Sequence, residues 1–341
     1  MSTLVLTDRA FLEHDPGAGH PESPGRLRAI LQDLVRSPVD GVTVQAPRPA
    51  TDAEIDAVHD PAYVRALVRL AGHRAQLDPD TAISPGSWEA ARLAAGAAVG
   101  AVEAVSGGQA QNAFVLARPP GHHAEPARAM GFCLLNNAAI AAEAARRGGA
   151  RRVLIVDFDV HHGNGTQDTF AARDDVQYMS VHQFPFYPGT GAAEEIGVGA
   201  GRGNTVNCPL PAGQADADYG AVFHDLFLPI AQAFAPDLVI ASAGFDAHAR
   251  DPLAQMQVSE RGFAAMVTAL GDLAAATCGG KLVLLLEGGY DLNALTDSVR
   301  ASLEALTGRR ESFPAGVGTA APQAIAAAWA AHRAARQARR G

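Results

Sequence analysis

The segment Val153–Gly165 reads VLIVDFDVHHGNG, and it holds both of the features that decide the fold. Its first four residues, Val153–Val156, are aliphatic and predict a strand that is buried on both faces, as the strands of parallel sheets are. Carboxylates and imidazoles follow at once in Asp157, Asp159 and His161. Because ligands of open α/β sheets bind beyond the carboxyl ends of the strands, the segment predicts a strand with a functional site at its end.

Similar aliphatic runs recur along the chain, with alanine-rich segments of helical length between them. Further strands are expected at Leu4–Leu6, Ala113–Leu116, Val176–Val181, Leu238–Ala241 and Leu282–Leu286. Helices are expected at Ser87–Val105, Asn136–Arg147, Asp218–Phe234 and Glu260–Ala276. Strands that alternate with helices indicate crossover units, so we expect an α/β fold with a single parallel β-sheet flanked by helices on both faces.

Neither a repeat nor a linker nor a shift in composition divides the sequence, so one domain, residues 1–341, is expected. The stretch His182–Gly213 is rich in glycine and proline and predicts a long ordered loop over the site. Arginines recur near the end of the chain, at Arg333, Arg336, Arg339 and Arg340. We expect them to complement the dipole of a final helix.

Composition excludes several classes of protein. A hydrophobic content of 48% with 18% charged residues is typical of a globular enzyme and not of a disordered chain. The net charge of −9 argues against binding to nucleic acid. No apolar stretch is long enough to span a membrane, and the polar start lacks a secretory segment. Three cysteines without paired spacing, Cys133, Cys208 and Cys278, suit a reducing compartment, so a cytoplasmic location is expected.

Polar residues follow five of the predicted strands. These segments are Arg118–His123, Asp157–Gly165, Ser180–His182, Ser242–His248 and Glu287–Tyr290. Carboxylates and imidazoles gathered at one edge of a sheet need a cation, because buried charge must be paired or bound to metal.

Asp159 and His161 stand two residues apart and direct their side chains to the same side, and Asp246 follows another strand. Three protein ligands with one open position are typical of a catalytic metal site. The mixture of one imidazole with two carboxylates favours zinc, with iron or cobalt as alternatives.

The sequence resembles the zinc-dependent histone deacetylase family, and in particular its class II-like bacterial branch of histone deacetylase-like amidohydrolases and acetylpolyamine amidohydrolases. The runs that carry the resemblance are RPPGHHA (118–124), GFCLLNN (131–137), DFDVHHGNGTQ (157–167), PGTG (188–191), SAGFDAHARDPL (242–253) and LEGGY (286–290). The resemblance extends from HPESPGRL (20–27) through ISPGSWEAA (83–91) to the last of these runs. It implies the arginase/deacetylase fold.

By resemblance, Asp159, His161 and Asp246 are the zinc ligands. His123 is implied to be the general base and then the general acid, while His122 acts mainly through its charge.

Asp157 is similar in position to the partner of His122, and Asn164 to that of His123. An aspartate partner raises the basicity of an imidazole more than an amide does, so the two histidines are expected to differ in pKa. Tyr290 is implied to donate its hydroxyl to the acyl oxygen.

The family also has a narrow acyl-lysine tunnel. By resemblance, Phe132 and Tyr187 would here be its aromatic walls, Gly131 would border it, and Leu253 is a further substrate-binding position. The position of Tyr187 usually holds phenylalanine, so the tunnel is expected to be more polar than is usual.

A structural potassium ion is also implied. It would be held by Asp157, by backbone oxygens of Asp159, His161 and Val181, and by the hydroxyl of Ser180. His162, His182 and His248 are expected to be structural or to lie at the rim.

These residues predict a zinc amidohydrolase that removes acetyl or another acyl group from the ε-amine of lysine in a peptide or protein, or from a small acylated amine. An acetylpolyamine deacetylase is the first alternative, and Leu253 argues against it because class II-type polyamine-selective relatives have glutamate there. A catalytically silent acyl-lysine binder would have lost a catalytic residue. A two-manganese ureohydrolase would need more aspartates. A homo-oligomer remains an open alternative to a monomer.

Overall fold

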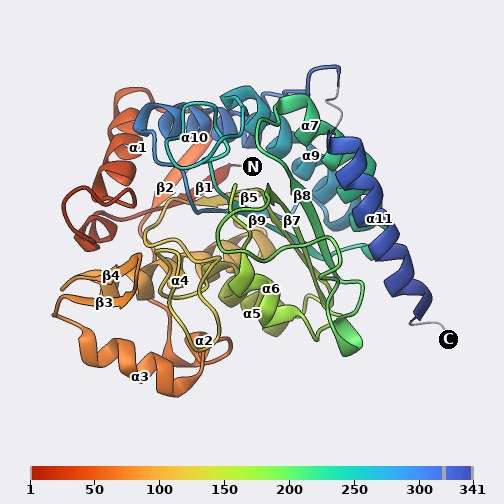
Figure 1. Cartoon of the computed structure of the whole chain (residues 1–341). Helices are drawn as coiled ribbons and strands as arrows, with labels where there is room; N and C mark the ends of the chain where they lie inside the picture. The colour runs from red at the N-terminus through yellow and green to blue at the C-terminus, as the bar shows by residue number, and fades with distance from the viewer. Residues whose placement is uncertain (1, 317–319, 339–341) are drawn as a thin grey trace.

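The computed structural model describes residues 2–316 and 320–338, and its centre is an eight-stranded sheet (Figure 1). All neighbouring strands in this sheet are parallel. The strands, in their order across the sheet, are β2 (Val42–Gln45), β1 (Thr3–Leu6), β5 (Asn112–Val115), β10 (Leu282–Leu286), β9 (Leu238–Ala243), β6 (Val153–Asp157), β7 (Val176–Gln183) and β8 (Thr205–Leu210). This confirms the predicted fold class.

Helices cover both faces of the sheet (Figure 1). One face is covered by α4 (Ser87–Ser106), α5 (Asn137–Arg147) and α6 (Asn164–Phe170). The other face is covered by α1 (Pro24–Arg36), α7 (Asp216–Val222), α8 (Leu228–Phe234), α9 (Glu260–Cys278) and α10 (Leu292–Leu306), and α11 (Ala320–Ala338) packs against β8 and α7. Arg339 and Arg340, which were expected at the end of this last helix, lie outside the described residues.

Shorter elements lie around this core. They are the 3-10 turns η1 (Arg9–Glu13) and η2 (Gly199–Gly201), the helices α2 (Asp52–Ile55) and α3 (Pro61–Leu70), and the antiparallel pair β3 (Ala75–Asp78) and β4 (Thr81–Ile83). Within residues 2–316 and 320–338, no helix combines the length and the apolar character needed to cross a membrane.

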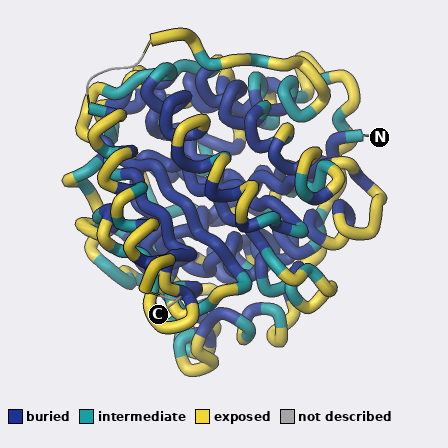
Figure 2. The backbone as a smooth tube through the Cα atoms, turned by 90° about the vertical axis from the view of Figure 1, so that its right-hand side faces the viewer, coloured by how far each residue is buried: buried dark blue, intermediate teal, exposed yellow. Residues whose placement is uncertain are grey.

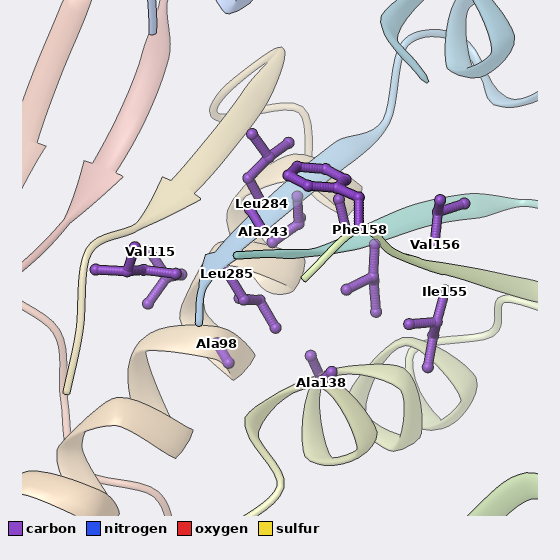
Figure 3. Packing of buried hydrophobic residues seen from close by; sticks show 14 of the residues in the cluster. Ala98, Val115, Ala138, Ile155, Val156, Phe158, Ala243, Leu284 and Leu285 are labelled. Atoms are coloured by element: carbon purple, nitrogen blue, oxygen red, sulfur yellow. The ribbon is translucent and has the colours of Figure 1, made fainter. Parts of the chain in front are cut away.

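The core is built by the central strands and the helices packed on them. Leu284 and Leu285 of β10, Ile155 of β6 and Ala138 of α5 are at most 1% exposed. Leu285, Ile155 and Ala138 lie on one side of the strands and Leu284 on the other (Figure 3). Burial is deepest through the sheet, and exposed segments lie at the outer surface (Figure 2). The continuous aliphatic runs of the strands are explained by this burial on both faces.

Helix starts are fixed by capping side chains near the carboxyl edge of the sheet. Asn136 accepts a hydrogen bond from the N–H of Ala139 at the start of α5. Asp291 accepts one from the N–H of Ala294 at the start of α10. Because these caps satisfy N–H groups that have no partner inside the helix, the helices begin at defined residues beside the strand ends.

Three local predictions were wrong. The stretch His182–Gly213 contains the end of β7 and the edge strand β8, which was missed because its sequence TVNCPL includes a proline, a residue that edge strands tolerate. The edge strand β2 was also missed, since it is short and exposed. The predicted helix Asp218–Phe234 starts at Asp216 and is interrupted by the π-helical turn Phe223–Phe227, called η3.

Candidate active site

Backbone N–H groups aim the carboxylates at the end of β6. Asp157 is the last residue of β6, and its Oδ1 accepts a hydrogen bond from the N–H of Asp159 at 3.2 Å. Asp159 Oδ1 accepts one from the N–H of His161 at 2.9 Å, and Asp159 Oδ2 one from the N–H of Gly288 at 2.8 Å. Asp246, which follows β9, accepts one from the N–H of Val160 at 2.9 Å. Loops from three strands are thereby tied together at one point.

This arrangement brings Asp159, His161 and Asp246 together as predicted. Their ligand atoms lie within 4.8 Å of one another, and all three residues are buried. His161 Nδ1 is 3.2 Å from Asp159 Oδ1 and 3.1 Å from Asp246 Oδ2. Burial and the charge of Asp159 raise the pKa of Asp246 to about 7. Two buried carboxylates beside one imidazole fit a divalent cation, and the donor set of one nitrogen and two carboxylates suits zinc.

Two glycines make this convergence sterically feasible. A Cβ atom on Gly244 would lie 2.0 Å from Asp159 Oδ2, and one on Gly288 would lie 2.1 Å from Asp246 Oδ2. Real Cβ atoms do not approach other atoms so closely, so these positions admit no larger residue while the carboxylates keep their places.

The tandem histidines lie beside this trio, each with the partner that was predicted. His122 Nδ1 is 3.1 Å from Asp157 Oδ2, and His123 Nδ1 is 2.8 Å from Asn164 Oδ1. The amide nitrogen of Asn164 donates to Glu125 Oε1, so its oxygen faces His123. His123 Nδ1 therefore carries the hydrogen, and Nε2 keeps the lone pair.

The surroundings give the two imidazoles different pKa values. Burial opposes a charge on His122, but Asp157 and Asp159 outweigh it and raise its pKa to about 10. Burial, together with the charges of His122 and His161, holds the pKa of His123 well below its ordinary value. One imidazole is thus charged and its neighbour is neutral, which is how a site separates two proton-handling tasks.

Tyr290 approaches the site from the loop after β10. Its N–H donates to Asp251 Oδ2 at 2.6 Å, and the guanidinium of Arg26 lies 5.0 Å from its ring centre. Gly289 has φ +120°, a backbone conformation that favours glycine and that turns the chain toward the site. Burial raises the pKa of Tyr290 well above its ordinary value, so its hydroxyl remains a hydrogen-bond donor.

A cavity of about 220 Å³ leads to these groups. Its lining comprises Asp80, His123, Gly131, Phe132, His161, Tyr187, Leu253 and Tyr290. All four residues predicted to bind the substrate, Gly131, Phe132, Tyr187 and Leu253, are among them. Gly131, with φ +56°, lies so close to His123 that a Cβ atom would be 2.2 Å from its ring.

Asp80 lines the same cavity and was missed by the sequence reasoning. Its Oδ1 accepts hydrogen bonds from the N–H of Gly131 at 3.2 Å and from the hydroxyl of Thr81 at 2.7 Å. In the sequence Asp-Pro-Asp indicates only a turn, and only the pairing of β3 with β4 brings this turn to the cavity.

The residues predicted for potassium gather on the neighbouring strands. Asp157 and Ser180 are register partners of β6 and β7, and Val181 follows Ser180. The Oγ of Ser180 lies 2.9 Å from His182 Nδ1, and His182 Nε2 lies 2.9 Å from the carbonyl oxygen of Gly191.

The other two histidines that were expected to be structural or at the rim also contact polar groups. His162 bonds to Thr190 and Gln167. His248 pairs with Glu260.

Comparisons with known proteins agree with this fold and place the chain in a family. The model of the histone deacetylase domain matches residues 20–306. The chain is 44% identical to histone deacetylase 15 of Arabidopsis thaliana over 90% of this chain and 57% of that protein, so it spans little more than half the length of this relative. It is 42% identical to a histone deacetylase-like amidohydrolase of Pseudomonas aeruginosa, covering 91% of this chain and 82% of that protein.

A probable deacetylase of Archaeoglobus fulgidus is 39% identical, over 86% of this chain and 82% of that protein. The crystal structure of the HDA15 HD domain superposes with a TM-score of 0.91 and 41% identity, covering 97% of this chain and 94% of that one. The fold is that of the arginase/deacetylase proteins. The chain belongs to the histone deacetylase family, and it is an enzyme of the deacetylase and amidohydrolase type.

Proposed function

We propose that the protein is a zinc-dependent amidohydrolase that removes acetyl or another acyl group from the ε-amine of lysine. The observation that carries this proposal is the trio Asp159, His161 and Asp246, because its member His161 lines the same cavity as His123 and Tyr290. A cavity of this kind admits a linear side chain and brings its terminal amide to groups that can take and give protons.

The zinc ion would be held by Asp159, His161 and Asp246. When bound, it polarises the acyl oxygen and makes a neighbouring water more acidic. The two carboxylates neutralise much of its charge, so a protein base is needed as well.

The chain's own residues supply the remaining chemistry. His123 Nε2 accepts the proton of the attacking water and later returns it to the leaving amine, since its pKa is low enough for the lone pair to be free. His122 stays protonated against Asp157 and stabilises negative charge. The hydroxyl of Tyr290 donates to the acyl oxygen as charge develops there.

We also propose the structural potassium site, formed by Asp157 and Ser180 with backbone oxygens of Asp159, His161 and Val181. His182 Nε2 donates to Gly191, so His182 Nδ1 accepts the hydrogen of Ser180. The lone pairs of the Ser180 oxygen are then available to a cation, which supports the assignment.

The substrate class follows from the wall of the cavity. Leu253 lines it without a charge that could attract the distant ammonium of a polyamine, so acyl-lysine in a peptide or protein is the proposed substrate. The protein is proposed to act as one domain in the cytoplasm, where its three buried free cysteines stay reduced.

The test is a panel of substrates with the purified, zinc-loaded enzyme. kcat/KM for an acetyl-lysine peptide is expected to exceed that for N-acetylputrescine and N8-acetylspermidine. Leu253→Glu is expected to reduce the ratio of these kcat/KM values by about tenfold, because one ion contact between the carboxylate and the polyamine ammonium is worth more than about 1 kcal/mol. Leu253→Gln, which has the same size without the charge, serves as the control. A tenfold preference of the unmodified enzyme for acetylpolyamines would favour the acetylpolyamine deacetylase instead.

A further inference from the structure

Glu287 is a buried carboxylate to which the proposed mechanism assigns no task. It directly follows β10 and precedes Tyr290 by three residues, and it is 1% exposed. Burial raises its pKa to about 7. A carboxyl group in such surroundings is costly, so its contacts need an explanation.

The side chain of Glu287 reaches across to the loop that carries the tandem histidines. Its Oε2 accepts hydrogen bonds from the N–H of Gly121 at 2.7 Å and from the N–H of His122 at 3.2 Å. Its Oε1 accepts one from the hydroxyl of Ser242, on β9, at 3.0 Å. One side chain thus joins the loops after β5 and β10 to β9, the strand between β10 and β6.

The two N–H groups have no substitute acceptor in the part of the chain that the structure describes. They are the first amide hydrogens after Pro119 and Pro120, which have none, and both residues are buried. Buried N–H groups without a partner are rare in folded proteins, so this segment depends on Glu287 for its position.

The backbone of the same loop fixes Tyr290. The carbonyl oxygens of Glu287 and Gly289 each accept a hydrogen bond of 2.6 Å from Arg26. The N–H of Gly288 holds Asp159, as described above. A displacement of Glu287 would therefore move the histidine pair relative to the tyrosine.

We propose that Glu287 is a positioning residue that sets the distance between the tandem histidines and Tyr290. It acts through the length of its side chain and through its two acceptor bonds to Gly121 and His122. The proposal rests on the deacylase function above for its kinetic test alone.

Two substitutions separate the reach of the side chain from its charge. Glu287→Gln removes the charge and keeps the reach, because the amide oxygen can accept from both N–H groups and the amide nitrogen can donate to Ser242. Glu287→Asp keeps the charge and shortens the side chain by one methylene. We expect kcat of Glu287→Asp to fall by about 10²-fold, since a small misplacement of reacting groups can cost that much. KM is expected to change less than about twofold, because the substrate is held by the cavity walls.

Glu287→Gln is expected to keep kcat within about fivefold of the unmodified enzyme. Ser242→Ala removes only the third contact of Glu287, and its kcat is also expected to stay within about fivefold of the unmodified enzyme. Zinc content, measured by elemental analysis, is expected to be equal in all four proteins. If Glu287→Gln is as impaired as Glu287→Asp, the reach of the side chain is not sufficient for activity, and the proposal is overturned. It is also overturned if Glu287→Asp has the kcat of the unmodified enzyme.

A second readout does not depend on activity. Hydrogen–deuterium exchange of the peptide that covers residues 117–124 reports on the N–H groups of Gly121 and His122. Their exchange is expected to be at least about tenfold faster in Glu287→Asp and unchanged in Glu287→Gln. Equal exchange in both variants would refute the proposed contacts, whereas faster exchange in an enzyme without deacylase activity would refute only the proposed function.

Discussion

Two adjacent imidazoles differ in their task because each has a different partner. The carboxylate of Asp157 keeps His122 charged, and the neutral amide of Asn164 lets His123 stay uncharged. The centres of the two rings lie 4.0 Å apart, so a positive charge on one imidazole disfavours a positive charge on the other.

His123→Ala is therefore expected to lower the single-turnover rate by about 10²- to 10⁴-fold, the usual contribution of general acid–base catalysis, and by more than His122→Ala does. Rapid-quench measurement of acetate release compares the two variants. If His122→Ala is the slower enzyme, the proton transfer belongs to His122 and the assignment is reversed.

Tyr290 is expected to act only once negative charge appears on the acyl oxygen. Tyr290→Phe keeps the ring packed at 6.0 Å from Phe132 and removes only the hydroxyl. We expect kcat to fall by about 10²- to 10³-fold with zinc content unchanged, the cost of one oxyanion donor. A loss of less than threefold in a steady-state assay would remove Tyr290 from the mechanism.

Among single residues, the site residues that directly follow a predicted strand were the easiest to predict from the sequence. Asp159, His161 and Asp246 could be predicted because the ends of parallel strands meet at one edge. Asp80 could not be, since its place depends on a small hairpin. The contacts of Glu287 with Gly121, 166 residues away in the chain, could not be predicted from a local pattern either.

Among the elements, a buried histidine joins the segment before α3 to the start of α5. His59 Nδ1 lies 3.1 Å from the carbonyl oxygen of Glu125, and His59 Nε2 accepts the N–H of Asn136 at 2.9 Å. Protonation of the ring would place a hydrogen on Nε2, where it would face the N–H of Asn136. Burial accordingly lowers the pKa of His59 to about 4.

The folded pKa of about 4 lies below the unfolded value of about 6.5, so the stabilisation by neutral His59 is present above pH 6.5 and is lost as the pH falls toward 4. His59→Gln keeps an acceptor and does not titrate. We expect the variant to be less stable than the unmodified protein at pH 7, and this difference to shrink by about 2 kcal/mol at pH 4.5. Urea unfolding at both pH values measures it, and a difference that stays constant would contradict the role of His59.

Elements inside the sheet were predictable, whereas elements at its edges were not. The strands β6, β9 and β10 are buried on both faces and show as aliphatic runs. The edge strands β2 and β8 have a polar or proline-containing sequence, because only one side of an edge strand must pair. Burial on both faces, and not strand formation itself, is what the aliphatic pattern reports.

For the whole molecule, the metal is expected to contribute to stability, because it binds the folded chain at residues from two strand ends. A ligand at 100 times its dissociation constant stabilises by about 2.7 kcal/mol, so removal of zinc with dipicolinate is expected to lower Tm by about 5 °C. Asp246→Ala should lose both the bound zinc and this response. Differential scanning fluorimetry measures both Tm values. If the chelator leaves the Tm of the unmodified protein unchanged, the proposed metal site is contradicted.

A buried cluster of ion pairs, one of them between residues far apart in the sequence, also concerns the whole molecule. Glu22 lies between Arg26 and Arg118, and all three side chains are fully buried. Although burial opposes its charge, Arg118, His14 and Arg26 hold the pKa of Glu22 well below its ordinary value. Glu22 and Arg118 are 96 residues apart, so only the folded sheet reveals the pair.

The position of β10 in the sheet affects when the two halves of the sheet can pair during synthesis of the chain. Within residues 2–316 and 320–338, β10 is the last strand in sequence, but it lies between β5 and β9 in the middle of the sheet. Among the described strands, only β10 joins the half-sheet that ends in the tandem histidines to the half-sheet that ends in the metal trio, so this pairing forms only after β10 has left the ribosome. A nascent chain without β10 therefore has its two sets of reactive groups on half-sheets that no strand pairing joins, and we expect hydrolytic activity only after β10 has been added.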